Sequence, residues 1–252
     1  MRQVPQKNTY LIIGSGRLAS HLIQYFKLLN ISVLKWSRNA NPDFNSFSNT
    51  STQERLQLCL KMCSHVLLAI SDEALETWIN DLLPKKRIIH FSGTYYNHKA
   101  FGIHPLMTFT KKLLNLEFYQ NIPMVTDYDP NTPTLGHLIP EWLNPYFYLP
   151  SHKKRLYHSL CVLSGNFTNL LWQRTFQLFE NELQLPKETL HYYLKMTCTN
   201  ILEDPYNSLT GPLVRQDKNT MIENQNALKD YRLDSLYEEF VKVYQNNFHG
   251  EN

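Results

Sequence analysis

Two glycines near the start of the chain form the first pattern that could do chemistry. Gly14 and Gly16 follow a short apolar run, and Ala19 stands where a G-x-G-x-x-G/A pattern has its third small residue. Glycines there let the backbone turn sharply and approach a ligand, and the unpaired N–H groups of the following helix can hold a pyrophosphate. An ordinary strand-to-helix turn is the alternative, because the pattern alone is weak. The predicted nucleotide contacts are Gly14, Ser15, Gly16, Arg17 and Leu18.

The end of the next predicted strand bears on which dinucleotide would bind. An NAD-selective site has an acidic residue there, roughly twenty residues past the glycines, for the ribose hydroxyls. This chain instead has Ser37 and Arg38, with no carboxylate before Asp43. Arg38 can form a two-pronged contact with a 2′-phosphate, and Ser37 can hydrogen-bond to the same group. The pattern therefore favours NADP over NAD, and a solvated loop cation is the alternative for Arg38.

Polar residues also follow two later apolar runs. Ser71 and Asp72 come after Val66 to Ile70, and His90 and Ser92 come at the end of the next run. Ligands of open α/β sheets bind at the carboxyl ends of the strands, so Ser71, Asp72 and Ser92 are predicted cofactor contacts. A helix N-cap is the alternative role for Asp72.

Histidine is the side chain best suited to proton transfer near neutral pH, and three histidines lie at strand ends or on a long predicted helix. His90 and His104 are candidate catalytic residues. Each histidine has a structural alternative: a hydrogen bond inside the strand layer for His90, a stiff turn before Pro105 for His104, and packing with Tyr157 for His158.

Two amides interrupt the apolar pattern of that long helix. Asn169 lies eleven residues after His158, about three helical turns, so the two share a face. Asn166 lies one turn before Asn169, next to Gly165. Buried amides are costly unless they have partners, which makes Asn166 a candidate catalytic residue and Asn169 a candidate substrate contact. A polar contact with another helix is the alternative.

A loop in the last quarter of the chain could shape a cleft. It combines Thr210, a Gly-Pro pair, Arg215 and Asp217. The guanidinium of Arg215 could bind a substrate carboxylate through paired N–H groups, with Thr210 beside it. A pair between Arg215 and Asp217, or capping of the next helix, is the alternative.

The elements that must position these residues fall into two groups. Short apolar strands alternate with helices up to about Pro150, which is typical of a doubly wound parallel sheet. No strand pattern appears after Tyr148, and the rest reads as helices, the first running from Ser151 to about Leu185. We predict an α/β fold, with a Rossmann-type parallel sheet domain over residues 1–150 and an all-α domain over residues 151–252.

Composition excludes several classes of protein. The chain has 252 residues, of which 42% are hydrophobic and 19% charged, as in a globular protein. A net charge of +3 gives no reason to expect a nucleic-acid partner. The chain shows no signal peptide and no apolar run of membrane-spanning length, which leads us to expect a cytoplasmic protein with no membrane partner. We interpret the cysteines as free thiols in a reducing compartment with no metal role; they are Cys59, Cys63, Cys161 and Cys198.

Several motifs occur together in one order: GlySerGlyArgLeuAla, SerArg, HisPheSerGly (90–93), HisProLeuMetThrPhe (104–109), TyrHis…Asn (157–166) and ThrGlyProLeuValArg (210–215). This order resembles a bacterial family with a Rossmann-like domain followed by a C-terminal helical domain of unknown function. That family is related in architecture to the pyrroline-5-carboxylate reductases and the 6-phosphogluconate dehydrogenase superfamily. The resemblance implies NADP bound between the two domains and a homodimer formed through the helical one.

The chain also departs from these families. Gln216 stands where the family tends to have glycine, and the middle of the long helix lacks the catalytic lysine of the hydroxyacid dehydrogenases. We therefore expect an NADP-dependent imine or ketone reductase that acts on a small anionic substrate, over a hydroxyacid dehydrogenase. A non-catalytic NADP-binding sensor or scaffold module is one alternative, and a helical interaction protein that binds no nucleotide is another.

Overall fold

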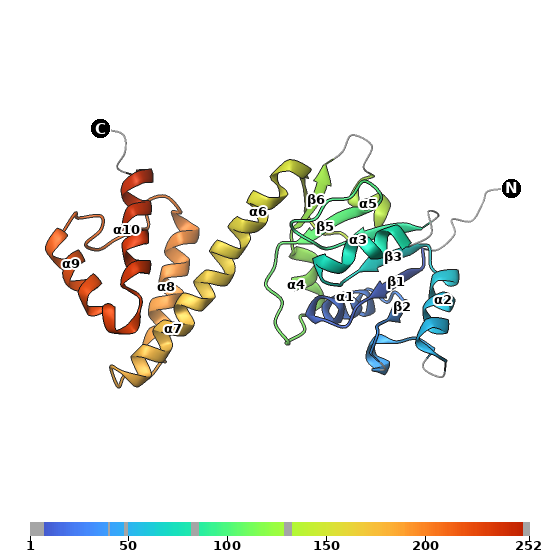
Figure 1. Cartoon of the computed structure of the whole chain (residues 1–252), viewed down its shortest axis with the longest axis horizontal. Coiled ribbons are helices and arrows are strands. Elements are labelled where there is room, and N and C mark those ends of the chain that lie inside the picture. The colour runs from blue at the N-terminus through green and yellow to red at the C-terminus, as the bar shows by residue number, and fades with distance from the viewer. Residues whose placement is uncertain (1–7, 40, 48–49, 82–85, 129–132, 249–252) are drawn as a thin grey trace. The chain divides into compact units, whose positions relative to one another are not determined.

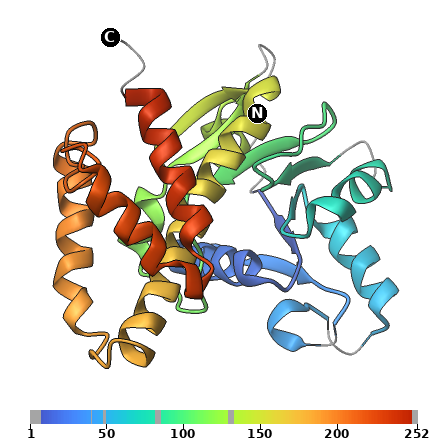
Figure 2. The same ribbon diagram turned by 60° about the vertical axis from the view of Figure 1, so that its left-hand side comes forward.

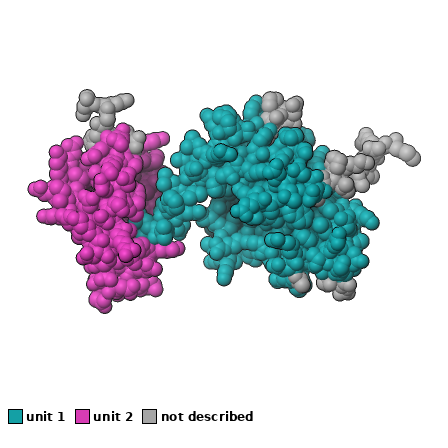
Figure 3. Space-filling model, viewed as in Figure 1, with its two compact units in different colours: residues 1–171 teal, residues 172–252 magenta. Residues whose placement is uncertain are grey.

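The computed structural model describes residues 8–39, 41–47, 50–81, 86–128 and 133–248. The chain forms two compact units, residues 1–171 and 172–252, which Figure 3 colours separately. In the described residues the strands all belong to the first unit, and the second unit contains helices and loops.

A seven-stranded sheet forms the centre of the first unit (Figure 1). Its order is β2-β1-β3-β4-β5-β6-β7, and all neighbouring strands are parallel except β5 and β6. The strands are β1 (Tyr10–Ile13), β2 (Val33–Trp36), β3 (His65–Leu68), β4 (Arg87–His90), β5 (Phe101–Pro105), β6 (Met124–Tyr128) and β7 (Tyr146–Pro150).

The strand order creates a switch point between β1 and β3. After β1 the chain moves outward to β2, and then crosses back to β3 on the other side of β1. Connections that leave in opposite directions open a crevice beyond the carboxyl ends of these two strands, which is where open α/β sheets bind ligands. The glycines of the first motif follow β1 directly, so they lie at this crevice.

Helices cover both faces of the sheet, as two views of the molecule show (Figures 1 and 2). One face packs against α1 (Arg17–Leu28), α4 (Leu116–Asn121) and α5 (Leu135–Leu138). The other packs against α2 (Thr52–Met62) and α3 (Asp72–Asp81). The strand residues divide between the faces by alternation: Tyr10, Ile12, Ile89 and Ile103 face the first set, whereas Leu11, Ile13, Val66, Leu68 and Ile88 face the second.

The remaining helices follow β7. They are α6 (Lys154–Cys161), a π-helical segment (Val162–Phe167), α7 (Thr168–Asn181), α8 (Thr189–Glu203), α9 (Lys218–Ala227) and α10 (Asp234–Phe248). Short 3-10 turns occupy Pro42–Phe44, Ser151–Lys153 and Lys229–Tyr231. Among the described residues, none of these helices has the length and apolar character needed to cross a bilayer.

The α/β fold class predicted from the sequence is confirmed, with two differences in detail. The sequence pattern did not identify β5, because Gly102 and Pro105 weaken its strand signal. The last strand ends at Pro150, where we predicted the domain boundary, whereas the first compact unit continues to Leu171. The extra residues belong to it because α6 packs against β5 and β6 through contacts of Lys154 and Tyr157.

Candidate active site

Gly14 allows three strand ends to come together at the switch point. Its φ of +139° is a conformation that only glycine adopts easily, and a Cβ there would lie 2.1 Å from the carbonyl oxygen of Ala69. Its N–H donates to the carbonyl oxygen of Trp36 at 3.0 Å. The first glycine of the motif is therefore required by the backbone itself.

Gly16 has a different role. It is the N-cap of α1 with an ordinary φ of −81°, and a Cβ built on it would meet nothing within 4 Å. Gly16 and Arg17 are exposed, while Ser15 and Leu18 are half-buried. The first turn of α1 contains no acidic residue and no side-chain cap, so its N–H groups are open to an anion. We call Gly14–Leu18 the glycine turn.

The loop after β2 separates the two residues predicted to bind the 2′-phosphate. Ser37 is buried: its hydroxyl donates to the Asn39 carbonyl at 3.1 Å and accepts from the Asn45 amide at 3.1 Å, and its N–H donates to the Asn45 side chain at 3.0 Å. Arg38 is exposed. Ser37 therefore fixes the loop, and Arg38 is the side chain that can reach a ligand.

Asp72 links the loops that follow β3 and β4. Its Oδ2 accepts hydrogen bonds from the Ser92 hydroxyl at 2.7 Å and from the Thr94 hydroxyl at 2.8 Å. Asp72 begins α3 and uses its carboxylate for these two hydroxyls, which is not the N-cap role that the sequence suggested. Ser71 and Asp72 are exposed and Ser92 is buried, so the solvent-facing part of this contact is the carboxylate.

His90 precedes Ser92 by two residues and lies in the interior of the first unit. It is fully buried, and its Nδ1 accepts the N–H of Ser92 at 3.3 Å. The neutral ring therefore carries its proton on Nε2, 4.0 Å from Oδ2 of Asp127. Burial, together with the charge of Lys154, lowers the pKa of His90 to about 3. This placement matches the structural alternative for His90, a hydrogen bond inside the strand layer.

A buried ion pair lies beside His90. Nζ of Lys154 is 2.5 Å from Oδ1 of Asp127, and both side chains are almost fully buried. Gly102 makes the space for it, because a Cβ there would lie 2.3 Å from the carboxylate and 2.8 Å from the ammonium. Burial raises the pKa of Asp127 and lowers that of Lys154, while each charge opposes the shift of its partner.

His104 contacts α6 as well. Its Nδ1 is 2.7 Å from the hydroxyl of Tyr157, and its ring centre is 5.9 Å from that of His158. Both histidine rings lie close to Gly93, because a Cβ on this glycine would lie 2.5 Å from the His158 ring and 3.2 Å from the His104 ring. Burial, together with the charges of His158 and Lys154, lowers the pKa of His104 to about 4. His104 is therefore neutral at pH 7.

We call His90, His104, Asp127, Lys154, Tyr157 and His158 the histidine cluster. Strand pairing places Ile13, Leu68, His90 and Gly102 in one row across the sheet, so the cluster lies at the same edge as the glycine turn. Sequence reasoning missed Asp127 and Lys154. Lys154 follows another lysine and so resembles a solvated pair, but its spacing from Tyr157 and His158, three and four residues, was a signal that all three share a helix face.

The other predicted residues lie elsewhere. Asn166 is exposed on the π-helical segment, and the exposed amide of Asn169 donates to the Gly165 carbonyl at 3.0 Å. Thr210 and Arg215 are exposed in the second unit. Within the first unit the structure thus brings His104 and His90 together, and leaves the two amides on an open helix surface.

The loop of the second unit shows why glycine suits one of its positions. Asp217 caps α9, accepting the N–H of Thr220 at 3.2 Å and its hydroxyl at 2.7 Å, as the capping alternative predicted. Gln216, where the related family tends to have glycine, has a φ of +55°. The left-handed conformation is thus kept here without the residue that adopts it most easily.

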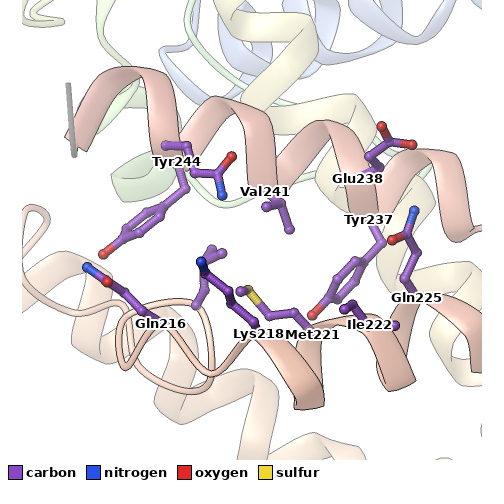
Figure 4. Close-up of a pocket in the computed structure, with 11 residues that line it drawn as sticks. Gln216, Lys218, Met221, Ile222, Gln225, Tyr237, Glu238, Val241 and Tyr244 are labelled. Atoms are coloured by element: carbon purple, nitrogen blue, oxygen red, sulfur yellow. The ribbon is translucent and has the colours of Figure 1, made fainter.

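The second unit also contains a half-open cavity of about 420 Å³ between α9 and α10 (Figure 4). Met221 and Val241 lie near its middle, with Gln216 and Lys218 toward one side and Ile222 and Tyr237 toward the other. Arg215, the predicted carboxylate ligand, is not among the lining residues.

The described residues offer no clear metal site. Within them, no three His, Cys, Asp or Glu side chains come together in a way that could hold a metal ion. The four cysteines are free thiols, with Cys59 and Cys63 buried in α2 and at its end.

Comparisons with known proteins agree with this geometry. Residues 123–244 match a family described as a domain of unknown function, DUF2520. A search of curated proteins found no match to the sequence.

Three solved structures share the fold across nearly the whole chain. A candidate NADP oxidoreductase from Bacteroides fragilis has a TM-score of 0.72 at 18% identity, covering 95% of this chain and 98% of its own. A reductive aminase from Aspergillus terreus, in complex with NADPH and ethyl-5-oxohexanoate, has a TM-score of 0.59 at 15% identity, covering 94% and 95%.

The third is the pyrroline carboxylate reductase of Plasmodium falciparum with NADP bound, with a TM-score of 0.57 at 12% identity, covering 94% of this chain and 96% of its own. The fold expected from the motifs, with an architecture like that of pyrroline carboxylate reductase, is therefore confirmed. Residues 123–244 thus match the DUF2520 model, and the chain has the Rossmann-like fold of these three structures.

Proposed function

We propose that this chain is an NADP-dependent reductase of a C=N or C=O bond in a small substrate. The observation that carries the proposal is the glycine turn at the switch point of the sheet, with an uncapped helix start and the exposed Arg38 beside it. Three structures of the same fold are described as an NADP oxidoreductase or as reductases with NADPH or NADP, which supports the assignment of the cofactor.

The residues present fit such a cofactor. The N–H groups of the glycine turn suit a pyrophosphate, because they are unpaired donors at the positive end of α1. Arg38 suits the 2′-phosphate, with Ser37 holding its loop. Ser71, Asp72 and Ser92 would face the nicotinamide end, at the carboxyl ends of β3 and β4. When bound, the cofactor supplies a hydride.

The protein's own task is then to orient the substrate and stabilise charge on its nitrogen or oxygen. We assign that task to His104 and Asn166, and we give His90 a supporting role because it is fully buried. Asn169, Thr210 and Arg215 are proposed substrate contacts, with Arg215 binding an anionic group. A location in the cytoplasm and a homodimer formed through the helical unit are part of the proposal, the first supported by the free thiols.

One titration tests the cofactor assignment. Calorimetry of the full chain with NADPH and NADH should show tight binding of NADPH and weaker binding of NADH. Loss of NADPH absorbance with a panel of cyclic imines and keto acids should then identify turnover. Absence of heat with both coenzymes would overturn the proposal.

A non-catalytic NADP-binding module is the second candidate. The specific observation in its favour is that His90 is fully buried, His104 is half-buried and both rings are neutral at pH 7, so neither histidine is a charged acid. It predicts tight NADPH binding with no turnover across the panel.

A further inference from the structure

One face of α6 meets the sheet with polar side chains. Lys154, Tyr157 and His158 are spaced three and four residues apart, so they lie one turn from each other on the same side of the helix. Each contacts a different part of the first unit: Lys154 reaches Asp127 on β6, Tyr157 reaches His104 on β5, and His158 lies against the loop after β4. An ordinary helix of this fold would bury apolar side chains there.

The ion pair at the start of this face is costly to bury. Two charges taken out of water recover that cost only with excellent geometry and further hydrogen bonds, and an apolar pair is often as stable. Here Oδ2 of Asp127 and Nε2 of His90 have no hydrogen-bond partner in the described structure. The pair also requires a glycine at position 102, because a Cβ there would clash with both charged groups. Stability alone therefore gives a poor account of Lys154 and Asp127.

The ion pair fixes the helix turn that carries Tyr157. Because Lys154 is tied to β6, Tyr157 is held three residues later with its hydroxyl 2.7 Å from Nδ1 of His104. When this hydroxyl donates to Nδ1, the neutral imidazole carries its proton on Nε2, on the opposite side of the ring. A neutral imidazole that donates a hydrogen bond is an established way to polarise a carbonyl without a proton transfer from the ring.

We propose that His104 is an uncharged hydrogen-bond donor to the nitrogen or oxygen of the substrate's double bond, and that Lys154, held by Asp127, is the positioning residue that keeps Tyr157 on the other side of the ring. This inference rests on the proposed reductase function and adds the way in which the site recognises the substrate. The carbon of the double bond would receive a hydride and the nitrogen or oxygen would take its proton from water, so the step needs no cationic acid on the protein.

Most of the charged and titratable groups around His104 favour its neutral form. Lys154 and His158 on α6 lower its pKa, and Asp72 on α3 opposes them weakly. The lowered pKa extends the range over which the ring stays neutral, down to about pH 4. Turnover should therefore be independent of His104 ionisation between pH 6 and pH 8, as an uncharged donor requires.

The test compares two neighbouring lysines in the full chain. Lys154→Met removes the buried ammonium, and Lys153→Met removes an exposed one from the preceding turn. We expect Lys154→Met to lower kcat roughly tenfold or more, because the ring is no longer held in place, with NADPH affinity unchanged. The pKa of His104, followed by NMR and assigned with His104→Gln, should rise in Lys154→Met. Lys153→Met should change none of these quantities.

A second variant keeps the test decisive if Lys154→Met does not fold. Tyr157→Phe retains the shape of the side chain and removes only its hydroxyl, so it should lower kcat while NADPH affinity and the melting temperature stay close to those of the wild type. Unchanged kcat in Tyr157→Phe, in a protein that binds and oxidises NADPH, overturns the inference and leaves the reductase proposal standing, whether or not Lys154→Met folds. Failure of the wild type to bind NADPH overturns the reductase proposal itself.

Discussion

The glycine turn and the histidine cluster lie at the same edge of one sheet, but the chain builds them in opposite ways. The glycine turn is a continuous segment that presents backbone N–H groups to a ligand. Its two glycines lack a side chain, which keeps the backbone accessible at Gly16 and prevents a clash at Gly14. The histidine cluster is assembled from β4, β5, β6 and α6, and it consists of buried and half-buried side chains that contact one another. The first depends on local geometry and the second on packing between distant segments.

Alanine substitution of each glycine of the turn tests whether the backbone geometry there determines the residue type. Gly14→Ala places a Cβ against the Ala69 carbonyl and forces a residue with a side chain to a φ of +139°. We expect a loss of about 3 kcal/mol or more in the free energy of unfolding, measured by urea denaturation. Gly16→Ala is the matched control, because a Cβ there meets nothing within 4 Å.

Gly16→Ala should leave the free energy of unfolding within about 1 kcal/mol of the wild type. It should still weaken NADPH binding, because the methyl group obstructs contact between a phosphate and the backbone N–H groups. Equal destabilisation by both substitutions would show that Gly16 is structural, like Gly14.

The buried His90 of the histidine cluster should make the free energy of unfolding depend on pH. The pKa of buried His90 is lowered to about 3, below its value in the unfolded chain. Stability from the neutral ring is therefore complete above about pH 6.5 and falls by up to about 1.4 kcal/mol per pH unit below it. His90→Asn keeps an acceptor for the Ser92 N–H and removes the titrating ring. Urea unfolding from pH 7 to pH 4.5 should show a shallower decline in His90→Asn, whereas parallel curves would contradict the assignment.

Arg38 tests whether the basic residue after β2 recognises a phosphate. Arg38→Ala should weaken NADPH by about tenfold, the loss of one charge-assisted contact at an exposed site, and weaken NADH much less. Calorimetry with both coenzymes measures the two effects in one protein. Equal losses would mean that Arg38 does not contact the 2′-phosphate.

The difference between the two regions explains what sequence reasoning could reach. The glycine turn could be identified because Gly14, Gly16 and Ala19 are close together in the chain and the backbone dictates their types. The residues of the histidine cluster are spread over sixty-nine positions, from His90 to His158 counted inclusively. Asp127 and Lys154 look like surface residues in the sequence, and only the fold pairs them, beside Gly102 of β5. That strand was itself missed, since Gly102 is present to make room for a contact that no local pattern reveals.

Asn166 is a residue for which the sequence pattern predicted the wrong environment. The sequence suggested a buried, partnered amide, but the structure leaves it exposed on the π-helical segment. Asn166→Ala should therefore leave the melting temperature unchanged, and π-helical turns are frequent at functional sites. We expect NADPH affinity to be kept and kcat to fall by roughly fivefold, about 1 kcal/mol of transition-state stabilisation. Unchanged kcat would remove Asn166 from the proposed site.

Gln216 gives the smallest expected effect and extends the comparison to the second unit. Like Gly14, it lies at a loop position with positive φ, here +55°, but it carries a side chain where glycine would relieve the strain. Gln216→Gly should raise the free energy of unfolding of residues 172–252 by about 0.5 to 1 kcal/mol, because the relief of strain slightly exceeds the added entropy of the unfolded chain. Hydrogen exchange of the α9 and α10 amides measures that unit directly. A loss of protection would show that the Gln216 side chain, which lines the cavity of Figure 4, contributes contacts worth more than the strain it causes.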